Sequence, residues 1–287
     1  MTKGELGSSK PGKPGRKAQK YTKDAPEKGG TVQSIIRALS LLELLAEDDE
    51  GYRLTDLAER TGLSPSTVHR LLTTMEERRF VQFDASDGMW HVGRQSFSIG
   101  AAFVRRRNFV AQALPFLRRL RDDTRETVNL GVADEGEVVI LTQVESREIM
   151  RAITRAGGRA PMASSGLGKA ILATYSDNDL AAIIQRHGLR RMTPKSIIRG
   201  GKLRDALKCV RKQGYAVDDE EFAIGLRCIA APIYDEHGEV LAAISASGPS
   251  TRIPDERLAA LGRMVADAAG EITKALGGRP VQAPADS

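Results

Sequence analysis

Residues 164–169 have the composition of a small anion site at the start of a helix. They read Ser-Ser-Gly-Leu-Gly-Lys and lead into the helical stretch Ala-Ile-Leu-Ala-Thr-Tyr. Unpaired N–H groups and the positive end of the helix dipole attract an anion, and glycines permit its close approach. A nucleotide loop is excluded, because Ala163 stands where that motif needs Gly and Ala170 where Ser or Thr would hold magnesium. A small carboxylate suits such a site.

Three further polar residues can complete this site. Ser245 and Ser247 are two positions apart on an expected strand, so both point to one face, where buried hydroxyls need a hydrogen-bond partner. Asp218 opens the acidic run 218–221, which leads into a strand, and its carboxylate could accept from a ligand or hold the loop amides. The alternative is purely structural: a capped helix, satisfied serines and a solvated acidic loop.

Residues 54–79 have the pattern of a helix-turn-helix. A short helix ends at Gly62, and Ser64 and Pro65 are typical of the start of the next one. Apolar residues recur in the second helix every three or four positions and pack inward, which leaves a polar outer face. Its members are Ser64, Ser66, Thr67, His69, Arg70, Thr73 and Thr74. Such side chains can read base edges and phosphates in a major groove; an ordinary helical hairpin with a solvated face is the alternative.

The residues around this motif favour the first of these interpretations. Segments 80–83 and 89–92 alternate apolar and polar residues around the turn 84–88, which predicts a β-hairpin directly after the second helix. Together they predict a winged helix, with the hairpin along the phosphate backbone or the minor groove. A helix over 31–47 lies beneath it, and its apolar stripe is expected to serve only the core: Val32, Ile35, Ile36, Leu39, Leu42 and Leu45.

Charge is concentrated at the N-terminus of the 287-residue chain. The first thirty positions hold eight Lys and Arg residues against three Asp and Glu residues, which is most of the net charge of +6. This segment is too poor in apolar residues to fold alone, so we expect a disordered basic tail. Its Arg16 and Lys17 could follow phosphates as a flexible arm, or the tail could be a solubilising leader. A second basic cluster, 105–107, falls on an expected linker helix and could touch the flanks of the DNA or face solvent.

The remaining chain predicts an α+β sheet domain. Helices are expected over 110–121, 164–175, 177–186, 202–213 and 255–276, and strands over 127–133, 137–144, 215–218, 227–234 and 240–247, with an extended stretch at 152–154. No apolar run is long enough to cross a bilayer, and the first thirty residues lack a signal-peptide core, so we expect a cytoplasmic protein. Two cysteines without CxxC spacing predict neither a disulfide framework nor a zinc site.

These motifs resemble the IclR family of bacterial transcriptional regulators over residues 31–278. The matching stretches are VQSIIRALSLLELLA, LTDLAERTGLSPSTVHRLLTTM, PMASSGLGKAILA, GYAVDDEE, GLRCIAAPIYDEHG and AAISASGPSTRI. The resemblance is strongest to the glyoxylate-responsive members. It implies a disordered tail at 1–30, a winged helix-turn-helix domain at 31–94, a linker helix at 95–108, a GAF-like α/β effector domain at 109–278 and a second disordered tail at 279–287. It also implies a palindromic DNA operator, and pairing of the chain into dimers and tetramers.

The family's small-acid pocket can be carried over residue by residue. Its polar part falls on Gly166, Leu167, Asp218, Cys228, Ser245 and Ser247, and its apolar wall on Ala152, Ala160 and Leu226. Three positions depart from the glyoxylate-responsive members, which have Met, Leu and Ala where this chain has Ala152, Ala160 and Leu167. These departures change the shape of the pocket. The resemblance itself implies an effector that is a 2-oxo acid, glyoxylate first and pyruvate or another small carboxylate next, and no cofactor or metal.

Two other classes of function compete with a ligand-sensing regulator. An enzyme acting on the acid would need Ser165 or Cys228 as nucleophile and a nearby base. The four histidines do not supply one, because His69 and His91 lie in the winged helix, His187 ends a helix and His237 lies in a turn. We therefore expect no catalysis. A structural DNA-bending protein without a ligand would bind DNA equally well at any acid concentration.

Overall fold

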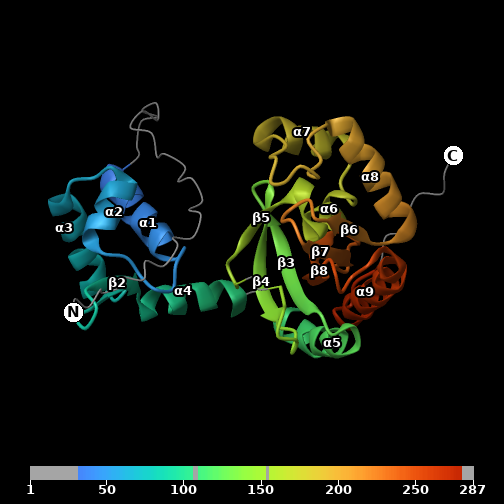
Figure 1. Cartoon of the computed structure of the whole chain (residues 1–287), viewed down its shortest axis with the longest axis horizontal. Helices are drawn as coiled ribbons and strands as arrows, with labels where there is room; N and C mark the ends of the chain where they lie inside the picture. The colour runs from blue at the N-terminus through green and yellow to red at the C-terminus, as the bar shows by residue number, and fades with distance from the viewer. Residues whose placement is uncertain (1–31, 106–108, 153–154, 280–287) are drawn as a thin grey trace, which may run out of the picture. The chain divides into compact units, whose positions relative to one another are not determined.

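The computed structural model describes residues 32–105, 109–152 and 155–279, which fall into two compact units divided between Arg105 and Arg106 (Figure 1). The predicted fold class is confirmed: a helix-turn-helix unit with a wing precedes an α/β unit built on one sheet. No helix among the described residues is long and apolar enough to cross a membrane. The predicted tail 1–30, with Arg16 and Lys17, lies outside the described residues, as do Arg106, Arg107 and residues 280–287 of the second predicted tail; Arg279, the first residue of that tail, donates its backbone N–H to the Asp235 carbonyl at 3.0 Å.

The first unit is a winged fold of three helices and a β-hairpin, followed by a fourth helix, α4. Its elements are α1 (Gln33–Leu45), α2 (Leu54–Thr61), α3 (Pro65–Glu77), β1 (Val81–Asp84), β2 (Met89–Val92) and α4 (Arg94–Arg105). Gly62 ends α2 in the left-handed conformation, and the Ser64 hydroxyl caps α3 by accepting from the N–H of Thr67 at 3.3 Å. The core consists of Leu41, Leu45, Leu57, Ala58, Val68, Leu72, Val81 and Trp90. Local sequence signals therefore place α3 as predicted.

The prediction that the apolar stripe of α1 is buried was wrong for four of its six residues. Val32, Ile35 and Leu39 keep 56%, 57% and 53% of their surface exposed, and Ile36 is exposed as well. Helix α1 instead turns Leu41 and Leu45 into the core. Both sets recur at helical spacing, so the sequence contains two apolar faces and periodicity alone does not tell which one is buried.

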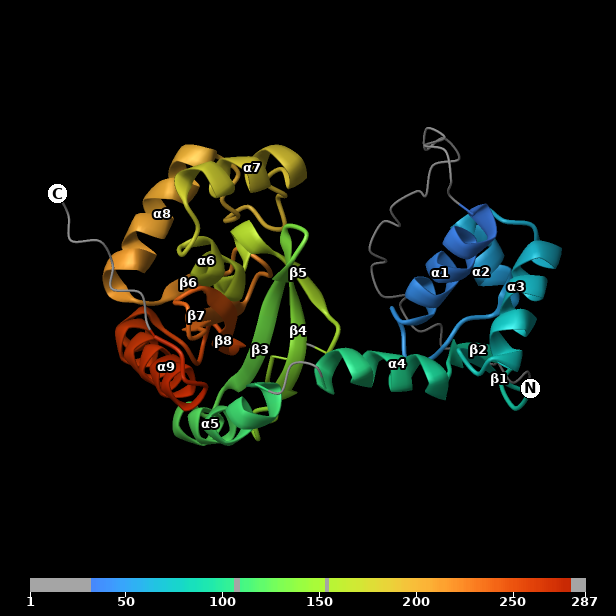
Figure 2. The same ribbon diagram turned by 180° about the vertical axis from the view of Figure 1, so that it is seen from behind.

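The second unit is an antiparallel six-stranded sheet with strand order β5-β4-β3-β8-β7-β6. The strands are β3 (Thr127–Asp134), β4 (Glu137–Val144), β5 (Arg159–Pro161), β6 (Ala216–Asp219), β7 (Leu226–Tyr234) and β8 (Val240–Pro249). Helices α5 (Phe109–Thr124) and α9 (Asp255–Ala275) pack on one face (Figure 2). The other face carries the short turn η1 (Met162–Ser164) and α6 (Gly166–Leu172), with α7 (Asp177–His187) and α8 (Gly200–Gln213) beyond them.

Several element boundaries differ from the sequence expectation. The helix expected to run to 175 ends at Leu172, and β5 was not expected at all. Ala152 is not in a strand, and the rest of the expected extension, 153–154, lies outside the described residues. Strand β5 has only three residues with a Pro at its end, so it is too short to show an alternating pattern.

Helix α6 lies against η1 with no space for a side chain at Gly168. A Cβ built there would come within 2.2 Å of the Cα and carbonyl oxygen of Met162, which are backbone atoms that cannot rotate away. We therefore expect Gly168→Ala to lower the free energy of unfolding by about 2 kcal/mol or more, measured by urea denaturation.

The matched control for this substitution is Gly201→Ala in α8, where an added methyl meets nothing within 4 Å. Ala is a better helix former than Gly, so this variant should be as stable as the parent or more stable by roughly 0.5–1 kcal/mol. Equal effects of the two substitutions would contradict the close approach of α6 to η1.

Candidate functional site

The outer face of α3 presents a small set of polar groups. Ser66, His69, Arg70 and Thr74 are exposed, and Thr67 and Thr73 are half-buried. The Thr74 hydroxyl donates to the Arg70 carbonyl at 2.7 Å, and that of Thr73 to the His69 carbonyl at 3.0 Å, so these side chains offer methyl groups and lone pairs to a partner. Within the described chain, His69 and Arg70 form no ion pair or side-chain hydrogen bond and keep all their donors for one.

The cap of α3 is a cluster of hydroxyls. Ser64 lies 2.8 Å from the Thr67 hydroxyl and 3.1 Å from that of Ser66. Ser64 therefore has a structural role at the helix start, while the backbone of this first turn still carries the positive end of the helix dipole toward solvent. Such a helix start can receive a phosphate oxygen.

The tip of the wing is acidic. Asp84 accepts from the N–H and hydroxyl of Ser86, which lowers the pKa of its carboxyl, and Asp87 accepts from the N–H of Met89. Two carboxylates at the turn repel phosphates, so the expected contact of this hairpin with the DNA backbone is not supported by its charge.

Exposed cations that the sequence motifs did not predict lie elsewhere in the unit. Arg78 and Arg79 follow α3 directly, Arg53 precedes α2, and Arg94 is the first residue of α4; all four are exposed. Their position in the sequence, next to the helix-turn-helix, could have identified them as candidate DNA contacts. They are candidates for phosphate contacts, together with Arg70.

The second unit gathers the predicted polar residues on one face of its sheet. Ser247 is directly opposite Cys228 on β7, and Cys228 is opposite Asp218 on β6, so the three form one row across the strands. Ser245 lies two residues along β8, on the same face, opposite Asn129 of β3. These five side chains are buried. We call them the polar strip.

Helix α6 begins directly over this strip. A Cβ on Gly166 would lie 2.9 Å from the Cys228 sulfur, so only glycine allows this approach. The Ser165 hydroxyl caps the helix by accepting from the N–H of Gly168 at 3.1 Å. The N–H groups of Gly166 and Leu167 have no acceptor among the described residues, and both residues are buried. The start of α6 thus offers two backbone donors and the strip two hydroxyls, which are the kinds of group from which an anion accepts hydrogen bonds.

Asp218 is the ionisable group of the strip. Burial raises the pKa of its carboxyl to about 7, and the nearby Lys169 ammonium opposes this only in part. One carboxylate oxygen accepts from the N–H groups of Glu221 at 2.7 Å and Phe222 at 3.2 Å, which fixes the loop after β6. The carboxyl can thus be neutral near neutral pH and donate a hydrogen bond of its own.

A buried ion pair between Lys169 of α6 and Glu221 lies close to the strip. Lys169 is 3% exposed, and its ammonium donates to the Val217 carbonyl at 2.5 Å and to a carboxylate oxygen of Glu221. The other Glu221 oxygen and the Ser164 hydroxyl are buried without a hydrogen-bond partner in the described structure. This region therefore has unused polar capacity, which is common where a polar ligand binds.

Neither nucleophile of the enzyme hypothesis is activated. Burial raises the pKa of the Cys228 thiol to about 11, so it is protonated at neutral pH. The Ser165 hydroxyl serves the cap of α6. His237 is exposed in a turn, and His187 lies beside Gly136 and Glu135 at the other end of β3 and β4. No described histidine is therefore placed to act as a base on either group.

The predicted apolar wall is only partly assembled. Leu226 lies on the same face of β7 as Cys228, two residues away. Ala152 is buried, and its carbonyl accepts from the Thr127 hydroxyl at 2.8 Å, next to Ser247 in the sheet register. Ala160, however, lies on β5, where it pairs with Val138 of β4, and β5 is three strands from β8 in the sheet. The register does not bring Ala160 to the strip.

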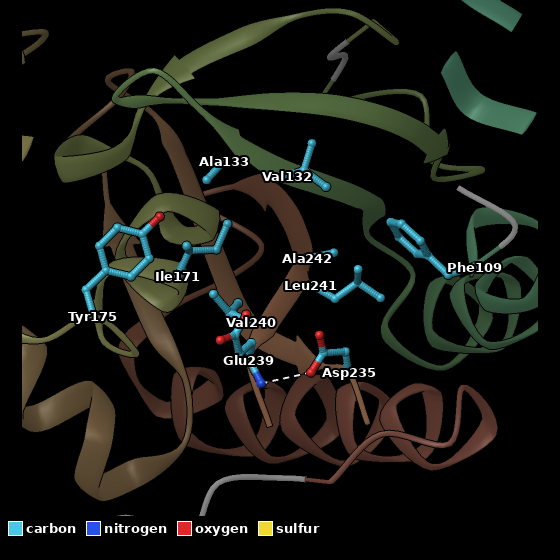
Figure 3. Close-up of a pocket in the computed structure, with 10 residues that line it drawn as sticks. All are labelled: Phe109, Val132, Ala133, Ile171, Tyr175, Asp235, Glu239, Val240, Leu241 and Ala242. Atoms are coloured by element: carbon cyan, nitrogen blue, oxygen red, sulfur yellow. Dashed lines mark hydrogen bonds between the residues drawn. The ribbon is translucent and has the colours of Figure 1, made fainter. Parts of the chain in front are cut away.

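A separate cavity of about 430 Å³ contains none of the predicted pocket residues (Figure 3). The β3–β8 pairing ends at Gly131 and Ala243, and the cavity is lined beyond that point by residues that include Val132, Ile171 and Tyr175. Its Asp235 carboxylate accepts from the N–H groups of the following turn. This cavity gathers no set of anion donors. No cluster of potential metal ligands occurs in the described ranges.

The raised pKa of Asp218 makes the stability of the protein depend on pH. Between the usual carboxyl pKa of 3.8 and about 7 the folded chain holds a proton that the unfolded chain has lost, so stability falls as the pH rises through this window. The side chain of Asp218→Asn stays neutral and serves as the reference. Relative to this variant, we expect the free energy of unfolding of the wild type to fall by up to roughly 4 kcal/mol from pH 4 to pH 7.5, measured by urea denaturation.

The control for this pH dependence is Asp205→Asn, at a carboxylate that is 77% exposed on α8. That variant should follow the wild-type dependence. The same pH dependence in Asp218→Asn and the wild type would contradict a neutral Asp218.

Comparison with known proteins agrees with both units. Residues 34–85 match the model of the IclR helix-turn-helix domain, and residues 101–274 match that of the bacterial transcriptional regulator IclR C-terminal domain. The acetate operon repressor of Salmonella typhimurium is 45% identical over 93% of this chain and 97% of its own.

Solved structures agree in the same way. The Thermotoga maritima IclR structure has a TM-score of 0.71 at 28% identity, over 85% of this chain and 98% of its own. An IclR homolog from Microbacterium hydrocarbonoxydans, complexed with 4-hydroxybenzoate, has a TM-score of 0.73 at 25% identity, over 85% of this chain and 99% of its own. With both domains matched and a close relative aligned over nearly its whole length, the chain belongs to the IclR family of bacterial transcriptional regulators.

Proposed function

We propose that the protein is a repressor whose operator binding is modulated by a small 2-oxo acid, glyoxylate first and pyruvate next. The observation that carries this proposal is the buried polar strip, where Ser245 and Ser247 lie on the sheet face that also contacts Gly166, at the start of α6, whose N–H groups at Gly166 and Leu167 are unpaired. A relative that is 45% identical is an acetate operon repressor, which favours target genes of two-carbon metabolism. A homolog complexed with 4-hydroxybenzoate supports a carboxylate as the class of effector.

The geometry suggests a role for each contact with the acid. The carboxylate accepts from the N–H groups of Gly166 and Leu167 and from the serine hydroxyls. Asp218, with a pKa of about 7, donates to the 2-oxo oxygen in its protonated form. Leu226 lies beside Cys228 as an apolar wall, which favours a short acid over a long one. Binding itself needs no cofactor, because each of these contacts comes from the chain.

Operator recognition is assigned to α3. Its exposed His69 and Arg70 can reach base edges in a major groove, while Arg78 and Arg79 can bind the flanking phosphates. One such helix covers only half of a palindromic operator, so two copies must bind with their helices one DNA turn, or a multiple of it, apart. The effector can shift operator affinity only through its differential affinity for the arrangements of these copies.

Self-association through α1 is the second part of the proposal. Val32, Ile35, Ile36 and Leu39 form an exposed apolar face on the side of the helix opposite its buried leucines. A helix that is apolar on two sides is stable when both sides are covered. We assign this face to a dimer contact between winged domains, with effector domains joining dimers into tetramers.

The experiment that tests acid sensing is fluorescence anisotropy on DNA from the protein's own promoter, at fixed salt. Titration with glyoxylate, pyruvate, acetate and oxalate should change operator affinity about tenfold or more for one acid, and least for acetate, which lacks the 2-oxo group. Ser245→Ala combined with Ser247→Ala should abolish this response and leave affinity without acid unchanged.

The matched control is Ser176→Ala, which removes the hydroxyl that caps the exposed start of α7. It should respond to acid as the wild type does. If no acid changes the affinity of the wild type, the sensing proposal fails and DNA binding alone remains. Turnover of any acid above background would favour the enzyme alternative instead.

The dimer contact is tested by placing charge on the exposed face of α1. Ile35→Glu with Leu39→Glu should shift the protein toward a smaller assembly in analytical ultracentrifugation and weaken operator binding about 100-fold, because two linked half-site contacts become one. Gln33→Glu, an added charge at the exposed first residue of the same helix, is the control. An unchanged assembly in the double variant would place the contact elsewhere.

A further inference from the structure

Asn129 is a buried polar residue on β3, within the six-stranded sheet, that belongs to the polar strip but is not one of the predicted pocket residues. Its side chain is 3% exposed, and its amide nitrogen lies 3.5 Å from the Ser245 hydroxyl and 3.4 Å from the Ser247 hydroxyl. One N–H₂ group thus faces both hydroxyls of the polar strip, with one hydrogen available for each. Both contacts are longer than the usual N···O distance of about 3.0 Å, so each hydrogen bond is weak.

The amide orientation of Asn129 is set from the other side. The Gln143 side chain, on the neighbouring strand β4, donates to the Asn129 side-chain oxygen at 3.1 Å. Gln143, Asn129 and Ser245 are directly opposite one another in the β4–β3–β8 register, so they form one continuous row. With its oxygen held by Gln143, Asn129 turns its N–H₂ group toward the serines.

This orientation decides what the serine hydroxyls can do. A hydroxyl that accepts from Asn129 has used a lone pair and keeps its own proton for another acceptor. We propose that Asn129, held by Gln143, is the positioning residue that makes Ser245 and Ser247 donors toward the bound acid. The inference rests on the proposed acid site and explains why that site selects an anion.

The Cys228 thiol lies on the same face of the sheet and competes only weakly for those protons. It is buried directly opposite Ser247, and burial raises the pKa of its thiol to about 11, so it is neutral. A neutral sulfur is a weak acceptor, whereas a carboxylate oxygen forms hydrogen bonds about twice as strong as neutral ones. A bound carboxylate is therefore the better acceptor for the two hydroxyl protons.

A purely structural role explains the row less well. An apolar residue at 129 would pack in the sheet without the cost of burying an amide. Thr127, the neighbouring polar residue on the same face, already uses its hydroxyl to hold the Ala152 carbonyl. In the part of the chain that the structure describes, the Asn129 side chain, in contrast, hydrogen-bonds Gln143 and the two serines and no other group.

The test is isothermal titration of glyoxylate into the full-length protein and its variants. Asn129→Ala frees the hydroxyls to point elsewhere and should weaken glyoxylate binding about tenfold. Asn129→Asp places an acceptor where the donor was, draws the serine protons away and adds like charge, so the loss should be roughly 100-fold or more. Asn178→Ala, at an exposed position of α7, is the control and should bind as the wild type.

A double-mutant cycle separates positioning from packing. If Asn129 acts through the serines, Asn129→Ala should cost clearly less in a Ser247→Ala background than in the wild type. Equal losses in both backgrounds would show that Asn129 only packs, and would overturn the inference. Thermal melting of each variant identifies any that fail to fold, and Gln143→Ala then provides a second probe, with an expected loss of a few-fold for the same reason.

Failure of this inference is distinguishable from failure of the proposed function. Wild-type binding of glyoxylate with unchanged binding by Asn129→Ala and Gln143→Ala would remove only the positioning role. A wild-type protein that binds neither glyoxylate nor pyruvate would overturn the acid site, and the positioning role with it.

Discussion

Burial of hydrogen-bonding groups inside an otherwise apolar layer is the constraint that organises the effector domain. Asn129, Asp218, Ser245 and Ser247 occupy interior positions of the sheet where apolar residues would pack without penalty. Each needs a partner, and the fold supplies most of them from neighbouring strands and from the loop after β6. The glycine at 166 brings α6 close enough for its first N–H groups to face the same space. Sheet register, helix position and loop conformation therefore all serve one polar interior.

A sequence predicts such an arrangement only where the signal is local. The cap at Ser64 and the αL end of α2 at Gly62 are local, so α3 was placed correctly. The alternation of Ser245 and Ser247 predicted a shared face, and the sheet register brings that face next to Cys228. The partner across β3 was not predicted, because Asn129 meets these serines only through pairing of strands that are more than 110 residues apart. The placement of Ala160 depends in the same way on a three-residue strand with no periodic signal.

Helix α1 shows a different reason for a wrong prediction. Leu41 and Leu45 form the face that packs against the rest of the winged domain, while Val32, Ile35, Ile36 and Leu39 form a second face that remains exposed. Hydrophobic periodicity measures how apolar a face is and not what covers it. A face that is covered by another copy of the chain has the same pattern as a face in the core. Periodicity alone therefore cannot distinguish a core face from a face that a second copy would cover.

Assembly also links the two activities that the proposal assigns to this protein. Among the described residues, Arg70, Arg78 and Arg79 are exposed on or next to α3, and the wing tip carries Asp84 and Asp87. Phosphate contacts provide much of the affinity for DNA, and a single winged domain makes only the contacts of one half-site. Two domains held together add their contacts at a high effective concentration. An acid that changes how effector domains associate can then change operator affinity strongly while touching no residue of α3. In the proposed function, the buried strip and the exposed face of α1 therefore act on each other through the free energy of self-association.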